Sequence, residues 1–205
     1  MARRGEALRE HILWTAKDAF LELGFERTSM DEVSARASTS KRSLYAHFES
    51  KERLFLAVID LVRGLFLGRL KTPADYGDDP VEALTLFCAR YLEILLYEPS
   101  IQTMRVSMAE IDRFPDGAAQ YFDVMFEQVQ LLVQTFLQIR FSLQTEPSER
   151  AAQQLLADLL HPRLPRALFG IDTLAKNFGE EGLSNDFDLK PVRDAVGRLI
   201  SSLRA

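Results

Sequence analysis

The sequence lacks the residues on which most catalytic and metal sites are built. Its 205 residues include a single cysteine, Cys88, so no internal disulfide can form, and a reducing cytoplasm is the expected location. The three histidines, His11, His47 and His161, are far apart, and none has a partner at metal-ligand spacing. Glycine-rich phosphate loops, nucleophile elbows and Cys-x-x-Cys motifs are absent. We therefore expect no enzyme activity, no metal and no cofactor.

Long apolar runs and strand-like patterns are also missing. No window approaches the roughly 18 uncharged apolar residues of a spanning helix, so no membrane span is expected. No segment sustains a polar–apolar alternation between turns, which argues against β-strands. Hydrophobic residues nevertheless make up 47% of the chain, which supports a folded core. The sequence predicts an all-α fold of about nine helices.

Apolar residues at helical spacing, with glycine and proline near the ends, place these helices. The expected ranges are 6–23, 29–37, 41–48, 50–70, 80–97, 99–113, 115–143, a helix that starts after Glu146-Pro147-Ser148, and 191–203. Gly24 should end the first helix, and the prolines at 162 and 165 should bend or break the eighth. The helix at 50–70 is apolar on more than one face, which is typical of a helix between two layers. Residues 170–189 are polar and mixed, and no element is assigned to them.

The most informative stretch runs from Thr28 to Leu54. Ser29 and Glu32 have the spacing of a capping box, in which each side chain accepts a free backbone N–H group. A small polar turn at residues 38–40 separates two short helices. Leu44 and Phe48 should point inward, whereas an outward face should carry Lys41, Arg42, Ser43, Tyr45 and His47. Two short helices at this spacing form a helix-turn-helix, whose second helix can enter the major groove of DNA.

These residues resemble the DNA-binding domain of the tetracycline-repressor (TetR) family of bacterial transcription regulators. The resemblance covers about the first quarter of the chain and rests on the residues 16–25, 28–29, 43–48 and 50–54. Two positions depart from the family pattern, because Ser34 stands where alanine is usual and Ser38 where glycine is usual. Glycine tolerates positive φ, and a serine in that turn would carry about 1 kcal/mol of strain.

The later part of the chain resembles the C-terminal domain of one TetR subgroup, the AefR-like regulators. The resemblance rests on the sequence from Met108 to Pro115 and on Tyr121-Phe122. It implies that the body binds a small hydrophobic effector and forms a homodimer through the last two long helices, the eighth and ninth. The expected domains are a helix-turn-helix DNA-binding domain at 1–50 and a helical effector-binding and dimerisation domain at 51–205, with the helix at about 50–70 as connector.

Charge is distributed unevenly along the chain. The net charge is −5, which is unusual for a nucleic-acid binder. Residues 1–53, however, carry ten basic and nine acidic side chains, whereas residues 54–205 carry 15 and 21. Residues 54–205 are acidic and basic residues cluster locally within 1–53, and this division limits non-specific adhesion to DNA. Phosphate binding scales with the number of cations that are presented.

The motif supplies the candidate DNA contacts. The positions of Tyr45, His47 and Lys51 match family positions that contact the phosphate backbone, although Tyr45 and His47 could simply be solvated. Lysine or arginine in the second helix prefers guanine O6 and N7, although one of the two cations could reach phosphate instead. The complete candidate set is Thr28, Ser29, Arg36, Thr39, Ser40, Lys41, Arg42, Ser43, Tyr45, His47 and Lys51.

Large apolar side chains recur at helical spacing in the body and are candidates for effector binding. An aromatic stripe at this spacing is more often plain core, and the family resemblance is what favours a pocket. The candidate ligand-binding residues are Phe87, Tyr91, Met104, Met108, Phe122, Met125 and Phe126.

The sequence thus predicts a ligand-responsive transcription regulator that acts as a repressor. It would be released from an inverted-repeat operator on double-stranded DNA by a small hydrophobic effector. One alternative is a helical small-molecule carrier or enzyme with a degenerate DNA-binding head. Another is an interaction module that acts through protein partners. Activation in place of repression stays open, and no residue identifies the effector or the operator.

Overall fold

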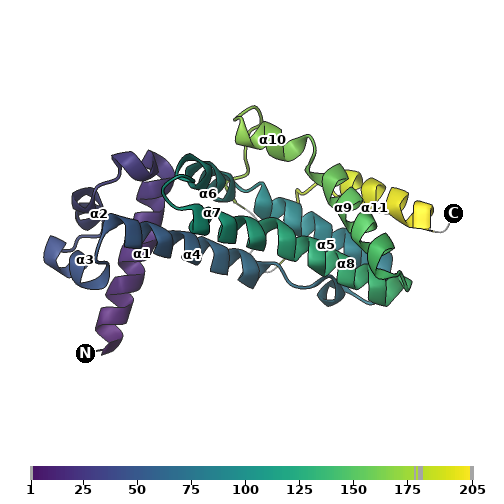
Figure 1. Ribbon diagram of the computed structural model, residues 1–205, viewed down its shortest axis with the longest axis horizontal. Coiled ribbons are helices and arrows are strands. Elements are labelled where there is room, and N and C mark those ends of the chain that lie inside the picture. The colour runs from purple at the N-terminus through teal and green to yellow at the C-terminus, as the bar shows by residue number, and fades with distance from the viewer. Residues whose placement is uncertain (1, 178, 180–181, 204–205) are drawn as a thin grey trace. The chain divides into compact units, whose positions relative to one another are not determined.

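The structure, a computed structural model, describes residues 2–177, 179 and 182–203, and these fold into helices without a strand (Figure 1). The helices are α1 (Ala2–Arg27), α2 (Met30–Arg36), α3 (Lys41–His47), α4 (Lys51–Arg69), α5 (Pro80–Leu95), α6 (Glu98–Ala109), α7 (Pro115–Phe122), α8 (Gln128–Phe141), α9 (Thr145–Leu160), α10 (Arg163–Leu168) and α11 (Lys190–Leu203). A 3-10 turn, η1 (Pro73–Tyr76), precedes α5, and a π-turn, η2 (Asp123–Glu127), joins α7 to α8. The predicted all-α fold is confirmed.

The nine expected helices are present, although α1 begins at Ala2 instead of residue 6 and α6 ends at Ala109 instead of residue 113. Three further differences concern the later helices. The expected helix at 115–143 contains the π-turn η2, and the short helix α10 follows the break at His161-Pro162. The expected start of the eighth helix after Ser148 was wrong, because α9 begins at Thr145. Pro147 therefore lies in the first turn of α9, where its missing N–H group has no partner to lose.

Contacts within the chain define two compact units, each with its own core. Unit 1 consists of residues 2–65 and Gln102–Tyr121, and unit 2 consists of Phe66–Ile101 and residues 122–203. In unit 1, α1 buries one face, which includes Ile12, Ala16, Ala19 and Phe20. The helical backbone of α1 is interrupted at Gly24, with φ of +78°, as expected for a glycine that ends a helix.

Unit 2 is built around α5, which is buried on nearly every side. The largest side chains in its interior, Leu84, Phe87 and Tyr91, have no exposed surface. Helices α8, α9 and α11 complete the unit, with α9 in contact with both α8 and α11 (Figure 1). Full burial of one such side chain stabilises the fold by about 1.5–3 kcal/mol. In the described part of the chain, no helix is long and apolar enough to cross a membrane.

Cys88 lies on α5 with no exposed surface, and burial raises the pKa of its thiol to about 12. The native protein should therefore resist a maleimide reagent at about pH 8, since the reactive thiolate is both scarce and covered. Labelling followed by mass spectrometry checks this, and addition of guanidinium chloride should make Cys88 react. An Ala119→Cys variant, with a cysteine at an exposed site, is the control. Native Cys88 reacting as fast as that exposed cysteine would contradict the result.

Candidate functional site

Two short capped helices, α2 and α3, form the candidate nucleic-acid interface in unit 1. The hydroxyl of Ser29 accepts the backbone N–H of Glu32 at 3.0 Å, and the hydroxyl of Ser40 accepts that of Ser43 at 3.1 Å. These bonds satisfy donors that a helix leaves unpaired in its first turn. The start of each helix is therefore fixed by its own sequence.

The turn between the helices has the left-handed backbone that its family pattern predicted. Ser38 has φ of +48°, and it follows the last residue of α2 by two positions. Its N–H donates to the carbonyl of Ala35 at 3.1 Å, and the N–H of Thr39 donates to that of Ser34 at 3.0 Å. This pair of bonds is a Schellman motif, which ends α2 and turns the chain into α3.

The outward face of α3 carries the residues expected to meet DNA. Lys41, Arg42 and Tyr45 are exposed, whereas Leu44 and Phe48 are buried, so the predicted division of the helix into two faces is confirmed. Thr39, Ser43 and His47 are partly buried at the edges of that face. The geometry presents two cations and a phenol on one exposed helix surface.

Two of the candidate cations already have carboxylate partners. The ammonium of Lys41 lies 2.6 Å from a carboxylate oxygen of Asp31 on α2. Arg36 donates to Glu22 at 2.6 Å and to Glu32 at 2.7 Å. The hydrogen bond to Glu22, followed by that to Glu32, raises the pKa of the Arg36 guanidinium, and the Arg36 bond lowers the pKa of Glu22.

The Glu32 contact corrects one expectation about the start of α2. Ser29 and Glu32 were expected to exchange two bonds as a capping box, but the carboxylate of Glu32 accepts from Arg36, one turn further along the helix. A charged partner at i+4 attracts this carboxylate more strongly than a neutral backbone N–H does. Only the Ser29 half of the expected box is formed.

Thr28 and Lys51, two further candidates, direct their side chains at the end of α1. The hydroxyl of Thr28 is buried and donates to the carbonyls of Gly24 at 2.8 Å and Ala19 at 3.2 Å. The ammonium of Lys51 donates to the carbonyl of Phe25 at 2.8 Å and lies 4.2 Å from the centre of its ring. Both side chains therefore fasten α1 to the segments that follow it.

The sequence pattern did not show that part of residues 102–121 packs into unit 1. The rings of Phe20, Phe25, Phe55 and Phe114 form one cluster, with centres 5.1–6.0 Å apart in the pairs that touch. Arg113 lies beside the cluster and forms a 2.6 Å ion pair with Glu26. The Phe114-Pro115 pair was visible only as part of a subgroup resemblance, which carries no information about packing.

The candidate effector residues differ in burial and belong to both units. Phe87, Tyr91 and Met125 are fully buried in unit 2, where the phenol of Tyr91 donates to the carbonyl of Met125 at 3.0 Å. In the same unit, Phe122 is exposed and Phe126 is partly buried, and their ring centres lie 5.1 Å apart. In unit 1, Met104 is buried and Met108 is half exposed. A role of these residues in ligand binding stays a prediction.

The geometry is that of a helix-turn-helix module, which consists of α2, the turn at Ser38 and α3. The rest of the described chain is also helical. A sequence model described as bacterial regulatory proteins of the tetR family matches residues 12–58. A second, described as the C-terminal domain of AefR-like transcriptional repressors, matches residues 82–178. The chain belongs to the TetR family, and its body is of the AefR-like type.

Several curated relatives match part of the chain. It is 42% identical over 62 residues to the transcriptional activator FasR of Mycolicibacterium smegmatis, a match that covers 28% of each chain. It is 37% identical over 54 residues to the regulator QacR of Staphylococcus aureus, covering 26% of this chain and 29% of QacR. It is 34% identical over 95 residues to the regulator RutR of Escherichia coli, covering 45% and 43%. The chain thus matches less than half the length of each relative.

Solved structures resemble the chain over nearly its whole length. A protein of Mesorhizobium loti assigned to the TetR family superposes with a TM-score of 0.75 at 22% identity, covering 97% of this chain and 98% of the other. The flavonoid-responsive regulator FrrA superposes with a TM-score of 0.70 at 23% identity, covering 97% and 95%. At this identity the likeness establishes a shared fold.

Replacement of Ser38 by glycine should stabilise the protein. Glycine adopts the observed positive φ without steric cost, and the expected gain is about 0.5–1 kcal/mol in the free energy of unfolding. Denaturant unfolding at equilibrium measures this change. Ala35→Gly, in the regular part of α2, is the matched control and should lose about 1 kcal/mol. A loss of stability in Ser38→Gly would show that the left-handed backbone carries no strain.

Proposed function

We propose that this protein is a sequence-specific DNA-binding transcription regulator in which α3 is the recognition helix. The observation that carries the proposal is the exposed face of α3, where Lys41, Arg42 and Tyr45 project from a helix held by its cap and by buried Leu44. A helix of this kind fits the major groove, and the phosphates attract its cations. Membership of the TetR family supports the same role.

The proposed contacts divide into base and phosphate contacts. Lys41 and Arg42 would face base edges, with Thr39 and Ser43 beside them, and each good bidentate contact is worth about 1–3 kcal/mol of discrimination. Phosphate contacts would come from a surrounding set, namely Ser29, Ser40, Tyr45 and His47. Thr28, Arg36 and Lys51 are proposed to act indirectly, because their polar groups already bond within unit 1.

We propose that the protein acts as a repressor and is released by a small hydrophobic effector. The match of residues 82–178 to the AefR-like repressor domain supports repression. The relative FasR is an activator, but its match covers 28% of this chain and therefore leaves most of the body untested. An effector can release DNA only if it binds the DNA-incompetent state more tightly, with about 1.4 kcal/mol of coupling for each tenfold loss of affinity.

A homodimer through α9 and α11, the expected eighth and ninth helices, completes the proposal. These helices contact each other, and each is amphipathic, with Leu155 and Leu159 of α9 and Val196 of α11 buried. Their outer faces carry small or polar residues such as Ala157 and Gly197, which permit close approach of a second copy. A two-fold dimer would read an inverted repeat with half-sites about 34–36 Å apart, or a multiple of this.

We propose that the N-terminal and C-terminal parts of the chain have separate roles. Residues 1–50 would bind DNA, residues 51–205 would bind the effector and dimerise, and α4 would connect the two. The hydrophobic effector would contact the aromatic and methionine side chains named above. Such a regulator works in the cytoplasm, where its DNA lies, and needs no catalysis.

Selection of the purified protein against random duplex DNA, at a stated near-physiological salt, tests the proposal. A two-fold-related site should be enriched. Lys41→Ala combined with Arg42→Ala should weaken binding to that site by at least about a hundredfold, because two base-reading contacts are lost. Arg150→Ala combined with Lys176→Ala removes the same charge from exposed positions of unit 2 and should leave the site affinity nearly unchanged. Binding that selects no sequence, or that survives the α3 substitutions, would favour a carrier or enzyme with a degenerate head.

Removal of the Asp31 carboxylate should strengthen binding to non-specific DNA. Asp31→Asn frees the ammonium of Lys41 from a 2.6 Å ion pair. An exposed pair of this kind is worth up to about 1 kcal/mol, so low-salt affinity should rise by about twofold to fivefold. Fluorescence anisotropy with a random duplex measures the change. Asp60→Asn breaks the comparable Asp60–Arg63 pair on α4 and should have a smaller effect. An unchanged or lower affinity in Asp31→Asn would mean that the pair does not restrain Lys41.

A further inference from the structure

Residues 171–188, which the sequence left without an element, line one side of unit 2 in the part that the structure describes. The carbonyl of Ala175 accepts the N–H of Glu98 at 2.9 Å, at the start of α6. Asp172 forms a two-pronged ion pair with Arg166 of α10, the shortest distance being 2.7 Å. These two contacts fix the first half of the segment against its neighbours.

A buried ion pair on α5 fixes the second half of the segment. Arg90 and Glu93 lie 2.7 Å apart and are 2% and 7% exposed. Arg90 also donates to the carbonyl of Gly182 at 2.7 Å, and the backbone N–H of Ser184 donates to Glu93 at 2.9 Å. The hydroxyl of Ser184 donates to the same carboxylate. Buried charges need such partners, so the loop and the ion pair stabilise each other.

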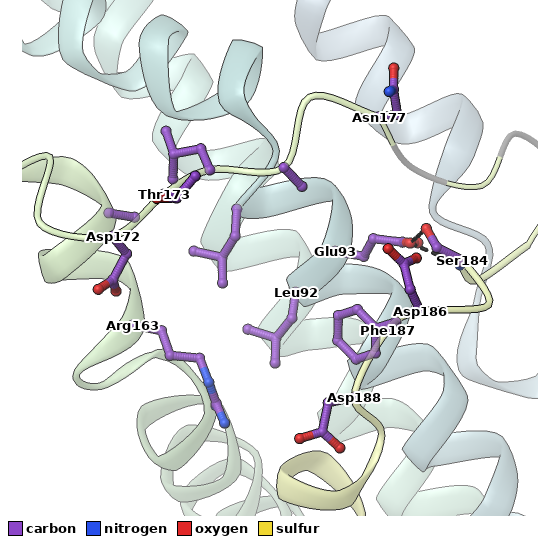
Figure 2. A pocket seen from close by; sticks show the side chains of 14 residues that line it. Leu92, Glu93, Arg163, Asp172, Thr173, Asn177, Ser184, Asp186, Phe187 and Asp188 are labelled. Atoms are coloured by element: carbon purple, nitrogen blue, oxygen red, sulfur yellow. Dashed lines mark hydrogen bonds between the residues drawn. The ribbon is translucent and has the colours of Figure 1, made fainter.

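The fixed segment closes a pocket of about 470 Å³ over α5 and α10 (Figure 2). Its apolar surface includes Leu92 of α5, Leu96 directly after that helix, Ala167 of α10 and Phe187 of the segment. A volume of this order suits a small organic ligand, and walls held by protein contacts reduce the cost of ordering on binding. The pocket contains none of the aromatic and methionine residues proposed above for the hydrophobic effector.

The charged groups around this pocket favour a cation. Four carboxylates line it, of which Glu93 and Asp172 are already paired with the guanidinium groups of Arg90 and Arg166. Asp186 and Asp188 have no cationic partner within the described residues, and they flank the Phe187 ring in Figure 2. Both are exposed, and Asp188 also accepts the backbone N–H of Lys190 at 3.0 Å at the start of α11. The opposing lining cation is Arg163, whose guanidinium donates to the carbonyl of Leu159 at the end of α9 at 2.9 Å. An anionic ligand would therefore meet more negative charge than positive charge.

We propose that this pocket is a second ligand site, which takes a small organic cation with a protonated amine on an apolar body. The amine lies against the carboxylates of Asp186 and Asp188, and the body packs on Leu92 and Phe187. The partly buried Phe187 ring beside them can also attract an ammonium through its face. The site goes beyond the proposed function, because it differs from the hydrophobic effector site in both position and charge.

Calorimetric titration of the full chain with matched probes tests the proposal. Benzylamine, phenethylamine and 4-phenylbutylamine are compared with the alcohols and carboxylic acids of the same carbon skeletons. The best amine should bind at least about tenfold more tightly than its alcohol, and the acid should bind most weakly. Asp186→Asn combined with Asp188→Asn should bring the affinity for the amine down to that for the alcohol. Asp116→Asn combined with Asp194→Asn removes the same charge from exposed helix positions and should keep the preference for the amine.

Ala175→Trp provides an independent test of location, because a large side chain at this exposed lining position should block both amine and alcohol. Equal affinity for amine and alcohol overturns the proposal, as does a preference for the amine that persists in the Asp186/Asp188 variant. Lack of saturable binding of every amine at millimolar concentration overturns it as well. The comparison of probes on the unmodified protein decides the result even if a variant fails to fold. DNA selection is measured separately, so failure of the regulatory function and failure of this site are distinguishable.

Discussion

The packing of four phenylalanine rings is the constraint on which the candidate DNA-binding surface depends. Phe20 and Phe25 come from α1, Phe55 from α4, and Phe114 from the segment between α6 and α7. Edge-to-face pairs of this kind add about 0.5–1.5 kcal/mol each beyond the apolar area that they bury. Since α2 packs on α1 and α3 packs on α2, a loss of the cluster would change the angle at which α3 is presented. A base-reading helix needs that rigidity, because small displacements break bidentate contacts.

The cations of unit 1 that could attract DNA differ in whether a neighbouring carboxylate pairs with them. Arg36 is held by two carboxylates, and Lys41 shares its charge with Asp31, whereas no ion pair restrains the exposed guanidinium of Arg42 in the described part of the chain. Internal pairing reduces the positive potential that any duplex would feel, while the groups proposed to read bases stay in place. Sequence discrimination gains from this arrangement, since the non-specific part of the affinity is the part that counterions set.

Local chemistry could be predicted from the sequence, and long-range pairing could not. The Ser29 cap, the buried position of Leu44 and the left-handed backbone of Ser38 depend on a few neighbouring residues, and the structure agrees with what those neighbours implied. The Glu32 half of the expected capping box did not form, because Arg36 is a charged partner one turn away. The Glu26–Arg113 ion pair depends instead on how distant segments fold together. The same reason explains why the contact between Glu93 and Ser184 could not be predicted. The sequence around Glu93 contains no information about which distant residue will donate to its carboxylate.

The buried Arg90–Glu93 pair also sets an order of events during synthesis. Its loop partners follow 92 residues after Arg90, at Gly182, and 91 residues after Glu93, at Ser184. A ribosome adds about 5–20 residues per second, so α5 leaves it roughly 5–20 s before those partners exist. In that interval Arg90 and Glu93, which interrupt the apolar part of α5, lack their hydrogen bonds to the late segment, and they resist burial. Completion of the core around α5 therefore waits for the segment that carries Gly182 and Ser184.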